Sequence, residues 1–244
     1  MESTPRVALV TGGARRVGRG IVERLAAAGF DVVFTYWQSE QEATDLTQAI
    51  GVKGRRVQAI RVDLTQPEAA SDELGRFIDE QFGRLDALIN NASIYQPGSL
   101  QSATVAQMRQ MFAIHAEAPL LLCRRFEKQL RQHQGHVVNM VDLLVQKPYA
   151  QYLAYCASKA ALANLTLGLA RELAPEVTVN GIAPGVVEWP VGYPEAQKQQ
   201  YLQRVPLGRS GTPRDVAELV YFLCTAGSYI TGQIIPLDGG RSIT

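Results

Sequence analysis

The chain of 244 residues is 46% hydrophobic and 19% charged, which is enough apolar material for the core of one α/β domain. Its 24 basic and 23 acidic residues give a net charge of +1 without any block of like charge, so nucleic acid is excluded as an expected partner. Three cysteines without metal-ligand spacing, no signal segment before the first strand and no run of about 18 apolar residues predict a cytoplasmic protein without bound metal or membrane span.

Apolar runs alternate with amphipathic stretches along the whole chain, and no Gly/Ser/Pro-rich linker divides it. Strands that are apolar throughout predict a parallel sheet covered on both faces. We therefore expect an α/β fold: a single doubly wound Rossmann-type domain over residues 1–244, with a seven-stranded parallel sheet and helices on both faces. The strands are expected at 6–10, 31–36, 55–62, 86–90, 135–141, 177–182 and 233–237, and the helices at 17–28, 40–50, 67–82, 105–131, 153–173 and 213–224.

Ligands of such sheets bind beyond the carboxyl ends of the strands, and the first of these ends carries a glycine-rich turn, TGGARRVGRGI. Gly12 leaves the strand and Gly18 opens the first helix, where free N–H groups and the helix dipole favour a pyrophosphate. The alternative is an ordinary tight turn.

The end of the second strand indicates which dinucleotide would bind. Sites for NAD usually carry an acidic side chain there, whereas this chain has Tyr36, Trp37, Gln38 and Ser39, with Arg15 in the adjacent turn. A 2′-phosphate is attracted by such a set, so the sequence predicts NADPH. The alternative is that Arg15 and Ser39 are merely solvated.

The next two strand ends carry polar groups with weaker signals. Asp63, followed by Leu64, could hold an adenine through its carboxylate, or could cap the helix that begins near Pro67. The run Asn90–Ala92 would satisfy strand-edge groups in any fold, and it gains meaning only beside other motifs.

Tyr155 and Lys159 supply the chemical signal. One helical turn places the phenol and the ammonium on the same face of a helix. We expect the lysine to lower the phenol pKa from about 10 towards neutral pH, which would make Tyr155 a proton donor.

The glycine turn, the Asn-Asn-Ala run, the Tyr-x-x-x-Lys pair and the later Pro184-Gly185 occur in the order and spacing of the short-chain dehydrogenase/reductases, which the chain resembles over essentially its whole length. The resemblance implies a nicotinamide cofactor, Lys159 on the nicotinamide ribose and Tyr155 handling the proton. It also implies a homotetramer built on the two long helices at 105–131 and 153–173.

One departure from that family narrows the chemistry. Most members place a serine thirteen residues before the tyrosine to hold a substrate carbonyl, whereas this chain has Asp142. A carboxylate about 4 Å from a growing oxyanion would repel it by about 4 kcal/mol at an effective dielectric of about 20, roughly a thousandfold in rate. A ring C=N gains hydride on carbon and a proton on nitrogen, so an amino-substituted heterocycle suits Asp142 better.

Arg16 is a second departure, because the commonest form of the turn has glycine there. Together with Asp142 it resembles the pteridine reductase branch of the family. The resemblance implies that Arg16 bridges the cofactor pyrophosphate and a pterin, which lies between the nicotinamide and Tyr95. Ser93 lies beside the nicotinamide, and a lid loop over about 184–210, irregular at 184–194 and similar to that of bacterial members, places Trp189 at the substrate.

Two more positions differ from the family pattern. His115 replaces the usual asparagine before the active site, as in a dihydromonapterin-reductase-like relative, which would alter a water-mediated proton path. Val187 stands where many members have a hydroxyl near the carboxamide, so backbone contacts are expected there. The expected cofactor-binding residues are Gly12, Arg15, Arg16, Val17, Tyr36, Trp37, Gln38, Ser39, Asp63, Leu64, Asn91, Ala92, Ser93, Met140, Tyr155, Lys159, Pro184, Gly185 and Val187.

The sequence thus predicts an NADPH-dependent pteridine reductase acting on a dihydropterin such as dihydrobiopterin or dihydromonapterin, with dihydrofolate as a further candidate. The catalytic residues are Asp142, Tyr155 and Lys159. Two alternatives stay open: a carbonyl reductase of the same fold, such as a 3-oxoacyl-carrier-protein reductase, and a catalytically idle NADPH-binding scaffold. The expected substrate contacts are Arg16, Ser93, Tyr95, Asp142, Tyr155 and Trp189.

Overall fold

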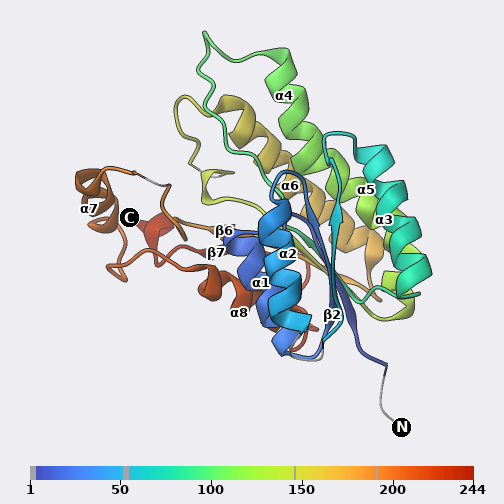
Figure 1. Cartoon of the computed structure of the whole chain (residues 1–244). Coiled ribbons are helices and arrows are strands. Elements are labelled where there is room, and N and C mark those ends of the chain that lie inside the picture. The colour runs from blue at the N-terminus through green and yellow to red at the C-terminus, as the bar shows by residue number, and fades with distance from the viewer. Residues whose placement is uncertain (1–3, 52–54, 146, 191) are drawn as a thin grey trace.

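A seven-stranded, all-parallel sheet organises the chain, with the strand order β3-β2-β1-β4-β5-β6-β7 (Figure 1). The computed structural model describes residues 4–51, 55–145, 147–190 and 192–244. Val191 of the expected lid and the first three residues of the expected domain therefore lie outside the described residues. The predicted α/β doubly wound fold is confirmed.

The strands form where apolar runs were predicted, because a parallel sheet covered by helices buries both faces of its central strands. Every residue of β1 and β4 is buried, whereas the edge strand β7 is only half-buried. The observed bounds are β1 (Val7–Val10), β2 (Asp31–Tyr36), β3 (Val57–Arg61), β4 (Ala87–Asn90), β5 (His136–Met140), β6 (Thr178–Pro184) and β7 (Ile234–Leu237).

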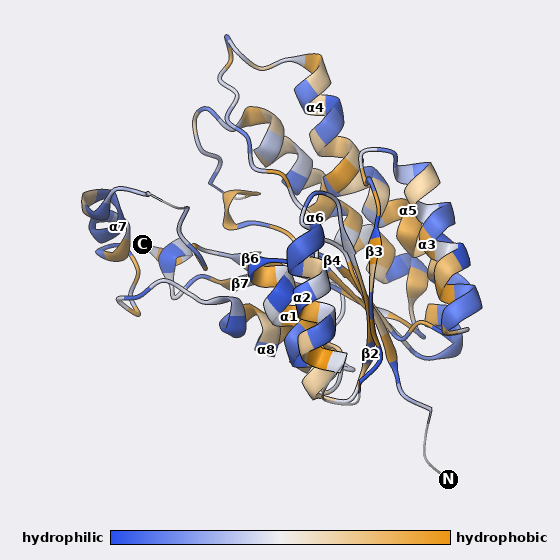
Figure 2. Cartoon of the chain, in the orientation of Figure 1, coloured by the Kyte–Doolittle hydropathy of each residue, from blue (hydrophilic) through white to orange (hydrophobic). Residues whose placement is uncertain are grey.

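Two layers of helices cover the sheet, one on each face (Figures 1 and 2). One core lies between the sheet and α1, α2 and α8, and a second lies between the sheet and α3, α5 and α6. The hydropathy colouring shows apolar strands in the middle and polar outer faces on the helices. The helices are α1 (Arg16–Ala27), α2 (Glu40–Gly51), α3 (Pro67–Gln81), α4 (Val105–Phe112), α5 (Ala118–Gln132), α6 (Leu153–Leu173), α7 (Glu195–Leu202) and α8 (Pro213–Leu223).

The single helix expected at 105–131 is interrupted, which corrects that prediction. A π-helical turn at Ala113–Glu117 separates α4 from α5, and the Ala118 N–H bonds to the Ala113 carbonyl. Pro119 lacks an N–H and cannot bond to the His115 carbonyl four residues earlier, so the α-helical ladder cannot be complete here. Turns of this type occur mainly at functional sites, and this one carries the buried His115.

The lid region contains a helix that the sequence did not predict. After β6, residues 185–190 and 192–194 are irregular, but α7 follows at Glu195–Leu202. None of the residues of α7 is buried, so it lacks the apolar stripe from which a helix is recognised in a sequence.

By length and composition α6 could cross a membrane, yet it is a core helix of this fold. Half of its most apolar window is buried, and its residues Ala170 and Leu173 pack beneath the sheet. No membrane span is therefore indicated for α6. The three cysteines, Cys123, Cys156 and Cys224, are buried free thiols.

Candidate active site

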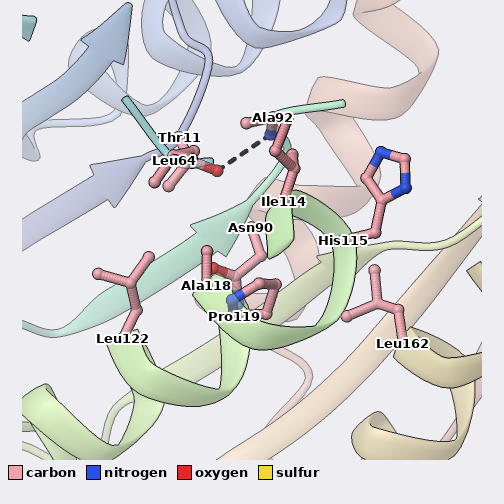
Figure 3. Close-up of a pocket in the computed structure, with 10 residues that line it drawn as sticks. All are labelled: Thr11, Leu64, Asn90, Ala92, Ile114, His115, Ala118, Pro119, Leu122 and Leu162. Atoms are coloured by element: carbon pink, nitrogen blue, oxygen red, sulfur yellow. Dashed lines mark hydrogen bonds between the residues drawn. The ribbon is translucent and has the colours of Figure 1, made fainter. Parts of the chain in front are cut away.

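The glycine turn and the end of β4 are tied together by hydrogen bonds. Thr11 Oγ1 accepts from the backbone N–H groups of Asn91 (2.9 Å) and Ala92 (3.0 Å), the second of which is drawn in Figure 3. The Asn91 amide donates to the carbonyls of Thr11 (2.9 Å) and Gly12 (3.0 Å). The side-chain amide of Asn91 therefore fixes the shape of the turn, and the predicted contact of Asn91 with a cofactor stays a prediction.

The turn presents a cradle that fits a phosphate. A Cβ at Gly18 would lie 2.1 Å from the Gly12 carbonyl oxygen, and Gly12 has a φ of +65°, so both positions require glycine. Arg15, the residue before α1, makes no capping bond with its side chain, which leaves the first N–H groups of α1 available to an anion.

Arg16 adopts a backbone conformation that favours glycine. Its φ is +51°, in the left-handed region that side chains rarely occupy. Its guanidinium reaches the lid, where Nε donates to Glu188 Oε2 (2.7 Å) and Nη2 donates to the Glu188 carbonyl (3.2 Å). The structure thus brings the predicted turn residue and the predicted lid together.

Arg15 points to the start of α2, next to the end of β2. Its Nη1 lies 3.4 Å from Glu42 Oε1, and both side chains are substantially exposed. The backbone of the turn is joined to the same strand, since Gly12 N donates to Thr35 Oγ1 (2.9 Å). Trp37, directly after β2, is exposed. Arg15 and Trp37 therefore lie at the two sides of the segment that joins β2 to α2, and their predicted contact with a 2′-phosphate stays a prediction.

A narrow pocket opens beyond β3 and β4 (Figure 3). Leu64, Ala92, Ile114 and His115 are among its lining residues. Asp63 does not cap α3: its Oδ1 accepts from the N–H (2.9 Å) and hydroxyl (2.7 Å) of Thr65. Its other carboxylate oxygen is therefore the one available to a ligand.

Among the residues that line this pocket, His115 connects the segment after β4 with α6. The Ile94 N–H donates to His115 Nε2 (3.2 Å), so Nε2 is unprotonated and also accepts from the Ser93 hydroxyl (3.0 Å). Nδ1 then donates to Ser158 Oγ (2.8 Å), whose hydroxyl donates to the Tyr155 carbonyl (2.8 Å). Burial, with the nearby Lys159 charge, lowers the pKa of His115 to about 2, so the ring is neutral.

Tyr155 and Asp142 form the central contact of the site. The Tyr155 hydroxyl donates to Asp142 Oδ2 at 2.6 Å, and Asp142 Oδ1 accepts from the Leu144 N–H at 2.8 Å. Lys159 is 2% exposed, and its Nζ donates to the Met140 carbonyl at 2.7 Å and lies 5.9 Å from the Tyr155 ring centroid. The three predicted catalytic residues therefore converge.

The pKa of Tyr155 differs from the prediction. Burial raises it well above 10, and the Asp142 carboxylate raises it further, so the expectation that Lys159 lowers it towards neutrality is wrong for this structure. Burial also lowers the pKa of Lys159 to about 8, although Asp142 acts in the opposite direction. The sequence spacing gave the positions of these groups but not their depth.

Tyr95 stands beside Tyr155 and is 52% exposed. Its ring stacks on Tyr152 with centroids 4.4 Å apart, and it meets Tyr155 edge-to-face at 4.7 Å. Sequence reasoning missed Tyr152, because its relation to Tyr95 depends on a loop contact: Gly98 N donates to the Gln151 carbonyl (2.5 Å). One face of Tyr95 is therefore already occupied by an aromatic ring.

The lid residues lie at the end of β6. Gly185 N donates to the Leu237 carbonyl (3.0 Å), and Val186 N donates to Tyr201 Oη (3.1 Å). Trp189 packs edge-to-face on Tyr201 (5.4 Å) and against Tyr193 (5.0 Å). Trp189 is thus held by aromatic contacts within the lid, and its predicted contact with substrate stays a prediction.

Comparisons with known proteins find relatives that match nearly the whole chain. The family model described as enoyl-(acyl carrier protein) reductase matches residues 12–242. A 3-oxoacyl-[acyl-carrier-protein] reductase of Aquifex aeolicus is 32% identical over 243 residues, covering 96% of each chain. Pteridine reductase 1 of Leishmania tarentolae is also 32% identical, over 284 residues that cover 99% of this chain and 98% of the relative.

Solved structures also match nearly the whole chain. A blue fluorescent protein from a metagenomic library, in complex with NADPH, is 34% identical, with a TM-score of 0.91 and 97% of each chain covered. A short-chain dehydrogenase/reductase from Serratia marcescens BCRC 10948 is 31% identical, with a TM-score of 0.90, 97% of this chain covered and 98% of the other. Relatives that act on different substrates have similar sequence identities to this chain. The substrate must therefore be inferred from the site.

Proposed function

The chain belongs to the short-chain dehydrogenase/reductase family of NAD(P)-dependent oxidoreductases, and from its site we propose that it is an NADPH-dependent pteridine reductase. The proposed reaction reduces a dihydropterin, such as dihydrobiopterin, dihydromonapterin or dihydrofolate, to the tetrahydropterin. Hydride reaches a ring carbon and a proton reaches the neighbouring ring nitrogen.

The 2.6 Å contact between Tyr155 and Asp142 carries this proposal. The carboxylate stands beside the proton donor, where a ketone substrate would develop negative charge on oxygen, so it would oppose carbonyl reduction. A ring nitrogen becomes more basic as hydride arrives, and the amino and N–H groups of a pterin can donate to Asp142. The pair therefore favours a C=N substrate.

The protonation state of Tyr155 suits reduction of the substrate, in which this residue donates a proton. Burial and Asp142 raise its pKa, which keeps the phenol protonated at neutral pH and able to act as an acid. Lys159, anchored on the Met140 carbonyl, retains two further donors for the ribose hydroxyls next to the reacting ring. Asp142 orients the substrate and holds Tyr155 in place.

The proposed cofactor, NADPH, supplies the hydride when bound. The cradle formed by Gly12 and Gly18 and the uncapped start of α1 fit its pyrophosphate. Arg15 would bind the 2′-phosphate beside Trp37. Replacing Arg15 with Ala is expected to weaken NADPH binding about tenfold more than NADH binding, since only NADPH offers a 2′-phosphate to the guanidinium.

Arg16 and Tyr95 are the proposed recognition residues for the pterin. Arg16 is held by Glu188, so the guanidinium already spans the gap between the phosphate turn and the lid. Tyr95, backed by Tyr152, offers an aromatic surface against which the pterin would stack opposite the nicotinamide. Such stacking would align the ring carbon with the incoming hydride.

We also propose a homotetramer in the cytoplasm. Leu120 of α5 and Leu153 and Leu167 of α6 are between 41% and 45% exposed, which supports contacts between these helices and those of another copy. The three free cysteines support a reducing compartment.

The competing function is carbonyl reduction. It is favoured by the similarity to the Aquifex aeolicus 3-oxoacyl-carrier-protein reductase. NADPH oxidation should be measured with dihydrobiopterin, dihydromonapterin, dihydrofolate and an acetoacetyl thioester. We expect a dihydropterin to give the highest kcat/KM. A thioester that turns over faster than every pterin would support the carbonyl reductase, and NADPH binding without any turnover would support an idle scaffold.

A further inference from the structure

Arg61, the last residue of β3, reaches across to the end of β2. The two strands pair in parallel with Arg61 in register with Tyr36, so the arginine emerges beside the segment that follows β2. Its Nε donates to the Trp37 carbonyl (3.2 Å), and its Cζ lies 4.8 Å from the centre of the Trp37 ring. The guanidinium is thus fixed by a backbone acceptor and an aromatic face.

The segment that follows β2 has different charged neighbours on the side of the glycine turn and on the side of β3. On the glycine-turn side, Arg15 is paired with Glu42, in the first turn of α2. On the β3 side, no ion pair of Arg61 with a carboxylate is found among the described residues. Glu40 also lies in the first turn of α2, so an incoming phosphate meets two acids and needs more than one cation.

We propose that Arg61 is a second cationic contact for the 2′-phosphate of the cofactor, acting from β3 opposite Arg15. The proposal rests on the assignment of NADPH in the proposed function. It adds a phosphate contact from β3, a strand that has no such contact in that function. The bond to Trp37 uses Nε, so the two terminal Nη groups remain to grip phosphate oxygens as a fork. The half-exposed Trp37 ring forms the floor beneath them.

Direct binding measurements test the proposal without any pterin. Calorimetry should compare adenosine 2′,5′-bisphosphate with 5′-AMP, and NADPH with NADH, for the unmodified protein and Arg61→Gln. We expect the substitution to weaken the ligands that carry the 2′-phosphate about tenfold and the others less than twofold. Arg61→Lys, which keeps the charge but loses the fork, should fall between them.

Arg56→Gln is the matched control. Arg56 lies just before the opposite end of β3, stacks on Phe82 with Cζ 4.0 Å from the ring centre, and donates to the Gln81 carbonyl (2.6 Å). Arg56→Gln also removes one positive charge that stacks on an aromatic ring. Because Arg56 lies away from the end of β2, we expect no change in the preference for the 2′-phosphate.

The outcomes separate this proposal from the proposed function. If Arg61→Gln weakens all four ligands equally, or behaves like Arg56→Gln while the unmodified protein still prefers the 2′-phosphate, the role of Arg61 is refuted. If the unmodified protein shows no such preference, the assignment of NADPH is refuted together with it. If the preference depends on Arg61 but no pterin is reduced, only the assignment of the substrate fails.

Discussion

The buried and exposed halves of the candidate site use charge in different ways. The proton-donor cluster, which consists of Asp142, Tyr155 and Lys159, lies at the base of the site, with Tyr155 5% and Lys159 2% exposed. The cationic rim, which consists of Arg15, Arg16 and Arg61, lies at the surface, where the side chains of Arg15 and Arg16 are 59% and 55% exposed.

Burial and exposure therefore have different consequences for the charged groups of the site. In the cluster, loss of hydration shifts the pKa of Tyr155 upwards and that of Lys159 to about 8. At the rim, exposed ion pairs contribute about 0–1 kcal/mol and can exchange one anion for another. We expect changes in the cluster to alter turnover strongly, and changes at the rim to alter ligand affinity modestly.

The largest expected effect comes from Asp142→Ser. It removes the carboxylate that contacts Tyr155 and faces the proposed substrate, so pterin turnover should fall by about two to four orders of magnitude while NADPH binding survives. Steady-state kinetics on the dihydropterin panel, with calorimetry of NADPH, would measure both.

Asp142→Asn is the control for shape, because it keeps the size of the side chain while removing its charge. It should also lower the Tyr155 pKa, since the carboxylate that raises it has gone. If Asp142→Ser retains nearly full pterin turnover, or gains more activity on an activated ketone than it retains on pterins, the pteridine assignment is wrong.

The second prediction concerns His115, whose hydrogen bonds link Ser93 and Ile94, after β4, to Ser158 of α6. Its pKa is lowered to about 2 in the folded protein, against 6.5 in an unfolded chain, so the unfolded state binds a proton first as the pH falls. The contribution of His115 to stability is therefore intact above pH 6.5 and lost progressively below it. Between pH 6.5 and 4.5 we expect a loss of about 2 kcal/mol in the free energy of unfolding.

Denaturant unfolding of His115→Asn over the same pH range would check this value. The variant should lose the part of the pH dependence that His115 causes, whatever its stability at pH 7, while His136, whose pKa burial also lowers, should keep its own part. His133→Asn, at the end of α5, is the control and should keep the acid sensitivity of the unmodified protein. An unchanged slope in His115→Asn would mean that other groups cause the acid sensitivity.

The division between buried and exposed parts also explains what the sequence could predict. The strands and most helices follow from apolar periodicity, and the convergence of Asp142, Tyr155 and Lys159 follows from the motif spacing. The π-helical turn at His115 depends on Pro119 and on the buried bonds to Ile94 and Ser158, which no periodicity encodes. The upward pKa shift of Tyr155 depends on depth, which spacing does not give.

The rim was predicted less completely, because its contacts join segments far apart in sequence. The pairing of Arg16 with Glu188 spans 172 positions, and Arg61 meets Trp37 only because β2 and β3 are neighbours in register. The helix α7 was missed because it buries none of its residues. Long-range polar contacts and unburied helices leave little periodic signal.

Arg16→Gly tests the rim at the glycine turn. Glycine accepts a φ of +51° without strain, so the phosphate cradle should persist and NADPH affinity should change less than threefold. The pterin loses its cationic partner, and its KM should rise about tenfold, consistent with one charge-assisted hydrogen bond. Arg19→Gly, which removes a neighbouring charge paired with Glu23, should leave the pterin KM unchanged. If only NADPH binding suffers in Arg16→Gly, Arg16 is a phosphate ligand and not a substrate residue.

The smallest effect is expected for Glu188→Gln, and its sign is informative. Glu188 holds the Arg16 guanidinium by a 2.7 Å contact, and both side chains are about half-exposed, so the pair is weak and reversible. Because the Glu188 carboxylate competes with a pterin for the Arg16 guanidinium, removing its charge should lower the pterin KM by about twofold to fivefold without changing kcat. Glu195→Gln is the control, since Glu195 pairs with Lys198 within α7 and does not contact Arg16 in the described part of the lid. A rise in KM would instead show that Glu188 assists substrate binding by holding the lid closed, and the rim would then act through lid closure and not through exchange of anions.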